Sequence, residues 1–183
     1  MDLKRIIEEI RSAQAPNSMP LKVVAIDGGG GAGKSTLAAR ISALLESAPV
    51  IPTDDFASWE NQFDWEDRFL DQVLRPVTRG EAARYQRYDW DIRSLAEWID
   101  IPFARYLIIE GVGSNRLAFT PFITYSIWVE ADRSERLRRG LDRDGVHMKQ
   151  QWQLWMNAED DYFGHDMPRE RSDVQVSGDS FPA

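Results

Sequence analysis

The sequence has no cysteine and only two histidines, His147 and His165. The missing thiols exclude disulfides, thiolate nucleophiles and cysteine-based zinc sites, and two histidines far apart disfavour a histidine-based metal site. A chain without cysteine fits a reducing compartment, so the sequence predicts a cytoplasmic protein.

The chain is also short of positive charge and of long apolar runs. Its 22 Lys and Arg residues against 30 Asp and Glu residues give a formal net charge of −8. This balance disfavours a protein that binds nucleic acid by neutralising phosphates. No apolar run approaches the roughly 20 residues of a membrane-spanning helix. We therefore expect a small-molecule partner, no nucleic acid and no membrane, while the sequence gives no indication of the oligomeric state.

Length and patterning indicate one domain over residues 1–183, about the size of an ordinary domain with its own core. Residues 1–16 predict an amphipathic helix, because apolar residues recur at helical spacing from Leu3 onward and Asp2 is a candidate cap. The alternating charge of this segment indicates a surface helix docked on the domain, not a signal peptide.

A glycine run follows the first apolar block, in the stretch VVAIDGGGGAGKSTLAARI. Gly28, Gly33, Lys34 and Ser35 fit the spacing G-x-x-x-x-G-K-[ST], in which backbone N–H groups wrap nucleotide phosphates. The lysine then reaches the β- and γ-phosphates, and the serine hydroxyl takes a Mg²⁺ ion. The order of strand, loop and helix places the anion at a helix N-terminus. The predicted phosphate-binding residues are Gly28, Gly29, Gly30, Gly31, Ala32, Gly33, Lys34, Ser35 and Thr36.

Further apolar segments predict strands, separated by segments with helical spacing. The predicted strands cover residues 21–26, 48–54, 105–112, 123–131 and 172–178. The helix after the glycine loop is predicted to present one apolar face, made of Leu37, Ile41, Leu44 and Leu45. This pattern predicts a three-layer α/β fold, a parallel five-stranded sheet with helices on both faces. Ligands of such sheets collect beyond the C-terminal ends of the strands, so functional residues should directly follow a strand.

Acidic residues follow three of these strands. Asp54 and Asp55 come after the second strand, Glu110 ends the third, and Glu130 and Asp132 follow the fourth. Carboxylates in such places suit phosphoryl transfer, which needs a metal ion and a group that accepts a hydroxyl proton. Acids after strands also cap helices, and we expect that role for Asp132 and a structural role for Glu130.

Arg136, Arg139 and Arg143 recur at spacings of three and four and so share one helix face. The guanidinium fork bonds phosphate bidentately and stays charged when water is excluded, which favours a phosphate-binding face. The alternative is a solvated face whose arginines pair with acids of the same helix.

Residues 84–94, RYQRYDWDIRS, mix aromatic and charged side chains without helical or strand periodicity. This mixture suits recognition of a flat polar ligand, although Tyr85 and Trp90 are more simply interpreted as core or rim residues. The other tryptophans are interpreted as packing residues, namely Trp98, Trp128, Trp152 and Trp155.

Over most of its length the sequence resembles the uridine kinase-like branch of the P-loop NTPases. The matching segments are IDGGGGAGKST, TDDF, FDWEDRF, YDW, IIEGV, WVEADRSERLRRGLDRD and RSDVQV. The resemblance implies a P-loop NTPase fold. It also implies that Asp54 is the general base toward a nucleoside 5′-hydroxyl, that Asp64 holds the ribose hydroxyls and that Tyr88 contacts the base. Arg139 and Arg143 would be the arginines of the lid.

The sequence departs from this family in its acceptor pocket and in its lid. Arg93 stands where uridine kinases have a base-reading histidine, and Gly140 stands where the lid has a second arginine. Two further arginines that follow the lid helix of the family are missing, so the lid region, residues 139–150, is short. An arginine in the acceptor pocket would suit an acid or a phosphate, which leaves the identity of the acceptor open.

Together these features predict an ATP-dependent kinase that moves the γ-phosphoryl group to a hydroxyl of a small molecule, with a nucleoside as the favoured acceptor. The predicted catalytic residues are Lys34, Asp54, Arg139 and Arg143. The predicted acceptor site consists of Asp54, Asp64, Tyr88 and Arg93. For Mg²⁺, Ser35 would be a ligand and Glu110 would orient a metal-bound water.

Two alternatives to this function stay open. One is a kinase for another metabolite, such as a sugar acid, a nucleoside monophosphate or a pantothenate-type compound, and the other is a regulatory protein that binds nucleotide without catalysis. A GTPase switch is disfavoured, because the chain has no N-K-x-D motif and its D-x-x-G, residues 142–145, follows an arginine-rich helix and is predicted to be a turn.

Overall fold

Five parallel strands form the main sheet, in the spatial order β2-β5-β1-β6-β7, which confirms the predicted sheet. The computed structural model describes residues 2–180. The strands of this sheet are β1 (Lys22–Asp27), β2 (Val50–Pro52), β5 (Tyr106–Glu110), β6 (Tyr125–Glu130) and β7 (Val174–Ser177). Their register brings the C-terminal ends together, because Glu110 pairs with Ile26 on one side and with Pro52 on the other.

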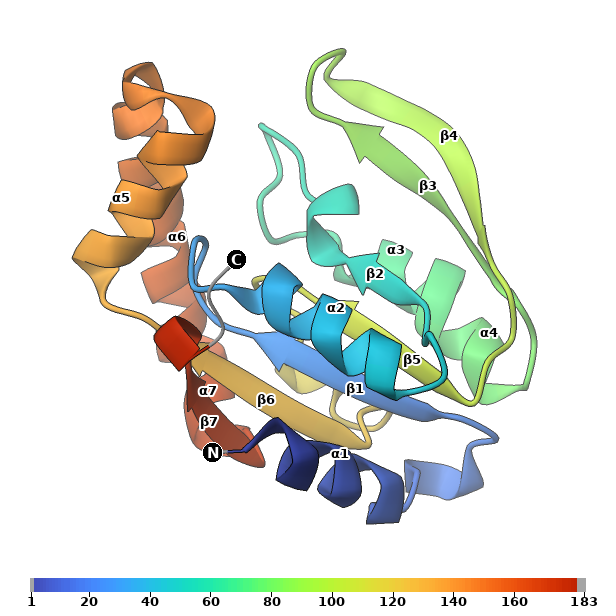
Figure 1. Cartoon of the computed structure of the whole chain (residues 1–183). Helices are drawn as coiled ribbons and strands as arrows, with labels where there is room; N and C mark the ends of the chain where they lie inside the picture. The colour runs from blue at the N-terminus through green and yellow to red at the C-terminus, as the bar shows by residue number, and fades with distance from the viewer. Residues whose placement is uncertain (1, 181–183) are drawn as a thin grey trace.

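Helices cover both faces of this sheet (Figure 1). They are α1 (Leu3–Ser12), α2 (Lys34–Leu44), α3 (Glu66–Phe69), α4 (Arg75–Thr78), α5 (Arg133–Asp144), α6 (Lys149–Asp166) and α7 (Pro168–Arg171). A π-helical turn, Leu70–Leu74, joins α3 to α4. None of the described helices has the length and apolar character to cross a membrane.

Alternate residues of the central strand point into two separate cores. Val24 and Ile26 pack with α1 and α2 on one face, whereas Val23 and Ala25 pack with the α3–α4 segment on the other. All four side chains are fully buried. Burial on both faces explains why the strands are unbroken apolar runs in the sequence.

The N-terminal helix forms as predicted, with one change at its end. The Asp2 side chain accepts a hydrogen bond from the backbone N–H of Lys4 at 3.2 Å, and the three isoleucines of the helix are buried. The helix ends at Ser12 and not at residue 16. The reason is Pro16, which disfavours helical geometry at the residue before it and begins a 3₁₀ turn.

One position of the predicted α2 face is wrong. Leu37, Ile41 and Leu45 are buried, but Leu44 is 46% exposed. The chain leaves helical geometry at Leu45, with φ −112° and ψ 58°. That turn carries Leu45 into the core and leaves Leu44 on the outside.

A hairpin that the sequence did not predict follows α4. It consists of β3 (Ala83–Asp89) and β4 (Ser94–Ile101), which pair as a separate antiparallel sheet and project away from the main sheet (Figure 1). The register shifts between Gln86 and Tyr88, which interrupts strict alternation and explains why residues 84–94 show no strand periodicity in the sequence. Trp98 on β4 is 46% exposed, which also corrects its interpretation as a packing residue.

The long helices α5 and α6 pack against each other beyond the C-terminal ends of β1 and β6 (Figure 1). The predicted lid region, residues 139–150, covers the end of α5, a 3₁₀ turn and the start of α6. The prediction of a turn at the D-x-x-G, residues 142–145, is wrong, because residues 142–144 continue α5 and only Gly145, with φ 94°, leaves the helix and ends it. Asp132 occupies the N-cap position of α5, as expected. Its side chain makes no hydrogen bond to the helix, so the residue has the position of a cap without the capping hydrogen bond.

We predict that Leu37→Ala and Leu44→Ala differ sharply in their effect on stability. Leu37 is fully buried, so its truncation should lower the free energy of unfolding by about 2–5 kcal/mol. Leu44 in the same helix is half-exposed, and its truncation should cost about 0.5 kcal/mol or less. Urea denaturation measures both values. Equal losses would contradict the assignment of Leu44 to the surface.

Candidate active site

The loop between β1 and α2 has the geometry of a phosphate-binding loop. Gly28, Gly31 and Gly33 adopt positive φ angles of 144°, 77° and 101°, which side chains other than glycine rarely adopt. Helix α2 begins at Lys34, directly after Gly33. The Lys34 side chain is buried, and its ammonium group donates a hydrogen bond to the carbonyl oxygen of Gly29 at 2.9 Å. The loop therefore curls around its own lysine at a helix N-terminus, an arrangement suited to an anion.

Two other glycines of the loop are in close contact with helices α5 and α6. A Cβ atom on Gly29 would be 1.6 Å from the Arg136 guanidinium of α5. A Cβ atom on Gly30 would be 2.9 Å from the Glu159 carboxylate and 3.1 Å from the Trp152 ring, both of α6. The glycine run thus serves two purposes, a left-handed backbone and close contact with two helices.

Asp27, which the sequence analysis missed, is the buried residue that holds the start of the loop. Its carboxylate accepts hydrogen bonds from the backbone N–H groups of Gly28, Gly113 and Asn115, at 2.7, 3.2 and 2.8 Å, and from the Tyr162 hydroxyl at 2.8 Å. Burial raises the pKa of Asp27, while these donors and the Lys34 charge act in the opposite direction. The available signal was its place, an acid at the end of an apolar strand.

Ser35 and Glu110 meet beside the loop, as their predicted role at a Mg²⁺ ion requires. The Ser35 hydroxyl donates a hydrogen bond to Glu110 Oε1 at 3.1 Å. Burial raises the pKa of Glu110, the nearby Lys34 charge lowers it, and the charge of Asp54 raises it further. A hydroxyl and a carboxylate fit Mg²⁺, which binds through one or two carboxylates and keeps several waters.

The structure separates the roles of the two adjacent aspartates. Asp55 accepts a hydrogen bond from the Tyr85 hydroxyl at 2.7 Å, and burial raises its pKa. Asp54 is exposed and lines two hollows next to the phosphate loop. Of the two carboxylates, Asp54 is therefore the one placed to meet a ligand.

The two hollows form one cleft, which we call the acceptor cleft, because both are lined by Asp54, Trp90 and Trp155. The larger hollow has a volume of about 320 Å³, within the size of small-ligand sites, and the smaller one of about 40 Å³. The remaining residues of the larger hollow are Trp59, Arg143, Asp144, Met148, Gln151 and Trp152. The tryptophans interpreted as packing residues at positions 152 and 155 therefore also line the cleft.

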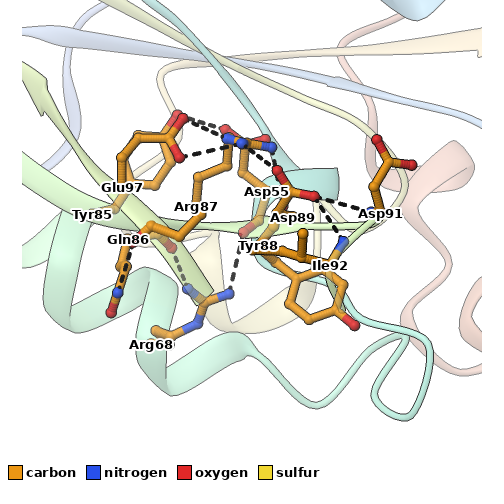
Figure 2. A network of polar contacts seen from close by, with 11 residues as sticks. Asp55, Arg68, Tyr85, Gln86, Arg87, Tyr88, Asp89, Asp91, Ile92 and Glu97 are labelled. Carbon is orange, nitrogen blue, oxygen red and sulfur yellow. Dashed lines mark hydrogen bonds and ion pairs between the residues drawn. The ribbon is translucent and has the colours of Figure 1, made fainter. Parts of the chain in front are cut away.

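Hydrogen bonds attach the β3–β4 hairpin to the segment that carries the aspartates (Figure 2). Tyr85 bonds Asp55, and the Arg68 guanidinium donates to the carbonyl oxygens of Gln86 and Phe56 at 2.6 and 2.7 Å. Within the hairpin, Arg87 bridges Asp89 and Glu97 at 2.8 Å each. These contacts fix Trp90, whose indole N–H donates to the carbonyl oxygen of Asp54 at 3.2 Å.

The three residues expected to bind the acceptor besides Asp54 lie in different places. Tyr88 is buried, its ring contacts Trp90 edge-on at 5.2 Å, and its hydroxyl has no hydrogen-bond partner among the described residues. Asp64 lines a separate hollow, and the Arg93 guanidinium lies 5.2 Å from the centre of the Trp59 ring. Among the described residues that line the acceptor cleft, none of these three occurs. Their roles stay predictions.

The arginines of α5 pair with acids of this chain. Arg136 is buried and bonds Glu159 at 2.7 Å, Arg139 bonds Glu135 and Asp179 at 2.9 and 2.5 Å, and Arg143 bonds Asp144 at 2.7 Å. The alternative of a solvated face paired with acids of the same helix fits Arg139 with Glu135 and Arg143 with Asp144. It does not fit Arg136, which is buried and pairs with α6. Binding of phosphate by Arg139 and Arg143 stays a prediction.

Trp152 explains the glycine at position 140. A Cβ atom on Gly140 would be 2.3 Å from the Trp152 ring, so only glycine lets this ring reach the phosphate loop. The indole N–H of Trp152 donates to Asp144 at 3.0 Å. At the end of β6, the Glu130 carboxylate accepts a hydrogen bond from the Trp128 indole N–H at 2.9 Å, in agreement with a structural role.

Comparison by sequence finds no relative, because no protein-family model matches the chain and no curated protein matches it significantly. Comparison by structure finds solved proteins with a similar fold. A protein from Bacillus stearothermophilus described as a possible uridine kinase superposes with a TM-score of 0.71 and 19% identity, over 95% of this chain and 96% of its own. A protein from Silicibacter sp. TM1040, assigned as a fructose transport system kinase, gives 0.70 and 20% over 96% and 99%. The fold is therefore that of the P-loop kinases, as the sequence predicted.

We predict that Glu110 makes Mg²⁺ binding pH-dependent. An ordinary glutamate has a pKa of about 4.3. Because the pKa of Glu110 is raised above its ordinary value, Glu110 takes up a proton at a higher pH than an ordinary glutamate does. The affinity for Mg²⁺ in the presence of ADP should therefore be full above that raised pKa and fall below it. Glu110→Gln should weaken Mg²⁺ binding by about 10- to 100-fold and remove this part of the pH profile.

Isothermal titration calorimetry between pH 5 and 8 measures both effects. Glu130→Gln is the matched control, because Glu130 ends β6, two strands away in the same sheet, and contacts Trp128 and Arg169 instead of Ser35. The same pH profile in wild type and Glu110→Gln would refute the assignment.

Proposed function

We propose that this protein is an ATP-dependent kinase that transfers the γ-phosphoryl group to a hydroxyl of a small molecule, with a nucleoside as the favoured acceptor. The observation that carries the proposal is the position of Asp54, whose exposed carboxylate lines the acceptor cleft beside a phosphate-binding loop. The P-loop kinase fold of the two solved structures supports the same reading.

On the donor side, the loop amides and Lys34 would hold the phosphates of ATP. Ser35 would ligand Mg²⁺, and Glu110 would orient a water of that ion. The ion supplies positive charge that neutralises the phosphates. The arrangement needs little movement, because Lys34 and Ser35 begin α2, whose Leu37, Ala38 and Ile41 are buried in the core on one face of the sheet.

On the acceptor side, Asp54 would take the proton of the attacking hydroxyl. The hydroxyl oxygen then bonds to the γ-phosphorus, and the bond from that phosphorus to the β–γ bridging oxygen breaks, so ADP leaves with the bridging oxygen. Arg139 and Arg143 would neutralise charge on the transferred group. Arg143 already lines the cleft with Asp54.

The charges and shapes of the cleft favour an uncharged acceptor with a flat body. Arg143 is the cation that lines the described cleft, and it is already paired with Asp144. Asp54 has no ion-pair partner among the described residues within 4.0 Å, so the net local charge opposes an acid or a phosphate. Four tryptophans offer apolar faces on which a flat ring can stack. A nucleoside meets both conditions better than a sugar acid or a nucleoside monophosphate.

A substrate panel tests this function. We expect Mg²⁺-dependent ATP consumption with one or more uncharged nucleosides, and none with sugar acids or nucleoside monophosphates. Lys34→Ala and a reaction without acceptor are the controls. Turnover only with anionic acceptors would replace the nucleoside by another metabolite, and ATP binding without turnover on any acceptor would favour a regulatory protein.

We predict that Asp54→Asn removes phosphoryl transfer and leaves ATP binding nearly unchanged. The loss of a general base should lower kcat by about 10²- to 10⁴-fold. Asp55→Asn is the matched control, because the asparagine can still accept the Tyr85 hydrogen bond and should retain activity within a few-fold. Coupled-enzyme kinetics and calorimetric ATP binding give the two readouts. Equal loss of binding and of turnover in Asp54→Asn would show a structural role.

A further inference from the structure

One backbone N–H group of the phosphate-binding loop is hydrogen-bonded to a carboxylate of this chain. Glu159 Oε1 accepts a hydrogen bond from the Gly30 N–H at 2.9 Å. Gly30 lies in the middle of the loop whose backbone N–H groups are suited to phosphate oxygens. Glu159 belongs to α6, more than a hundred residues later in the chain, so the contact exists only in the folded protein.

The same carboxylate is neutralised by a buried arginine. Glu159 Oε2 accepts a hydrogen bond from Arg136 Nη1 at 2.7 Å, and the two side chains are only 6% and 8% exposed. The Arg136 guanidinium in turn lies directly against Gly29. An anion and a cation are therefore both held against the loop, away from bulk water.

Glu159 also lines the acceptor cleft, in the smaller hollow together with Asp54 and Trp155. It therefore lies between the donor loop and the cleft. The phosphoryl group that is transferred must lie between the same two places, because it is bound by the loop and attacked from the cleft. Two anions in that space would repel each other strongly at low local dielectric constant.

We propose that Glu159 holds the Gly30 amide in place of an oxygen of the transferred phosphoryl group. When a nucleoside triphosphate binds, Glu159 leaves this amide and Arg136, released from its ion pair, turns its guanidinium to the phosphoryl group. Glu159 is then a positioning residue and Arg136 a phosphate-binding residue, and together they distinguish a triphosphate from a diphosphate. This inference rests on the proposed function, since it requires a nucleotide in the loop.

The inference predicts that Glu159→Gln binds a triphosphate more tightly without gaining affinity for a diphosphate. Glutamine keeps an oxygen for the Gly30 N–H but removes the charge that opposes phosphate. The dissociation constant of the Mg²⁺ complex of the β,γ-imido analogue of ATP should fall by roughly ten-fold. The dissociation constant of MgADP should stay within about two-fold, so the ratio of the two constants changes. Calorimetric titration of both nucleotides measures this ratio.

Asp160→Asn is the matched control on the same helix. Asp160 also bridges α6 to α5, through Arg133, but its side chain is 52% exposed. Its substitution should leave both dissociation constants unchanged. An unchanged ratio in Glu159→Gln, or equal weakening of both nucleotides, would overturn the inference. If wild type bound neither nucleotide, the proposed function itself would fail.

Hydrogen exchange of the wild-type protein gives a test that needs no substitution. The imido analogue should reduce the protection of residues 152–162 relative to MgADP, because Glu159 gives up its contact with the loop. Equal or greater protection with the analogue would overturn the inference even if Glu159→Gln did not fold.

Discussion

The buried carboxylate of Asp27 is the constraint on which the candidate site depends. It stands at the end of the central strand and accepts hydrogen bonds from the first amide of the phosphate loop, from two amides after β5 and from Tyr162 of α6. Burying a carboxylate is costly unless its oxygens are fully hydrogen-bonded, and four donors meet that condition here. One side chain thus fixes the start of the loop, the segment after Glu110 and the helix above them relative to one another.

Helix α6 connects the two halves of the site. Trp152, Glu159 and Tyr162 contact the loop side, at Gly30 and Asp27, while Trp152 and Trp155 line the acceptor cleft. This close contact explains why the loop has more glycines than its φ angles require. The same packing explains Gly140, because a side chain at that position would collide with the Trp152 ring, which lies between α5 and the loop. Helices α5 and α6 therefore pack on the phosphate loop through Arg136, Trp152 and Glu159.

The parts predicted well from sequence were those set by local pattern. Doubly buried strands, the glycine loop and the helix after it have strong local signals, and all lie where the sequence placed them. The hairpin was missed because a register shift interrupts the alternation on which recognition of strands depends. Leu44 and Trp98 were misplaced because their exposure is decided by a helix end and by an open hairpin face.

The sequence by itself determined the class of fold, the position of the phosphate loop and the acids that follow the strands, because periodicity and glycine spacing act over a few neighbouring residues. Strand position alone did not separate Asp54 from Asp55, and only the family resemblance selected Asp54. In the structure, a hydrogen bond from Tyr85 across 30 positions holds Asp55, and Asp54 lines the cleft. The sequence also gave no sign of Glu159, which reaches Gly30 across 129 positions. Tertiary structure decided these contacts, because the donors and charges that folding places beside a carboxylate determine whether it is paired, buried or open to a cleft.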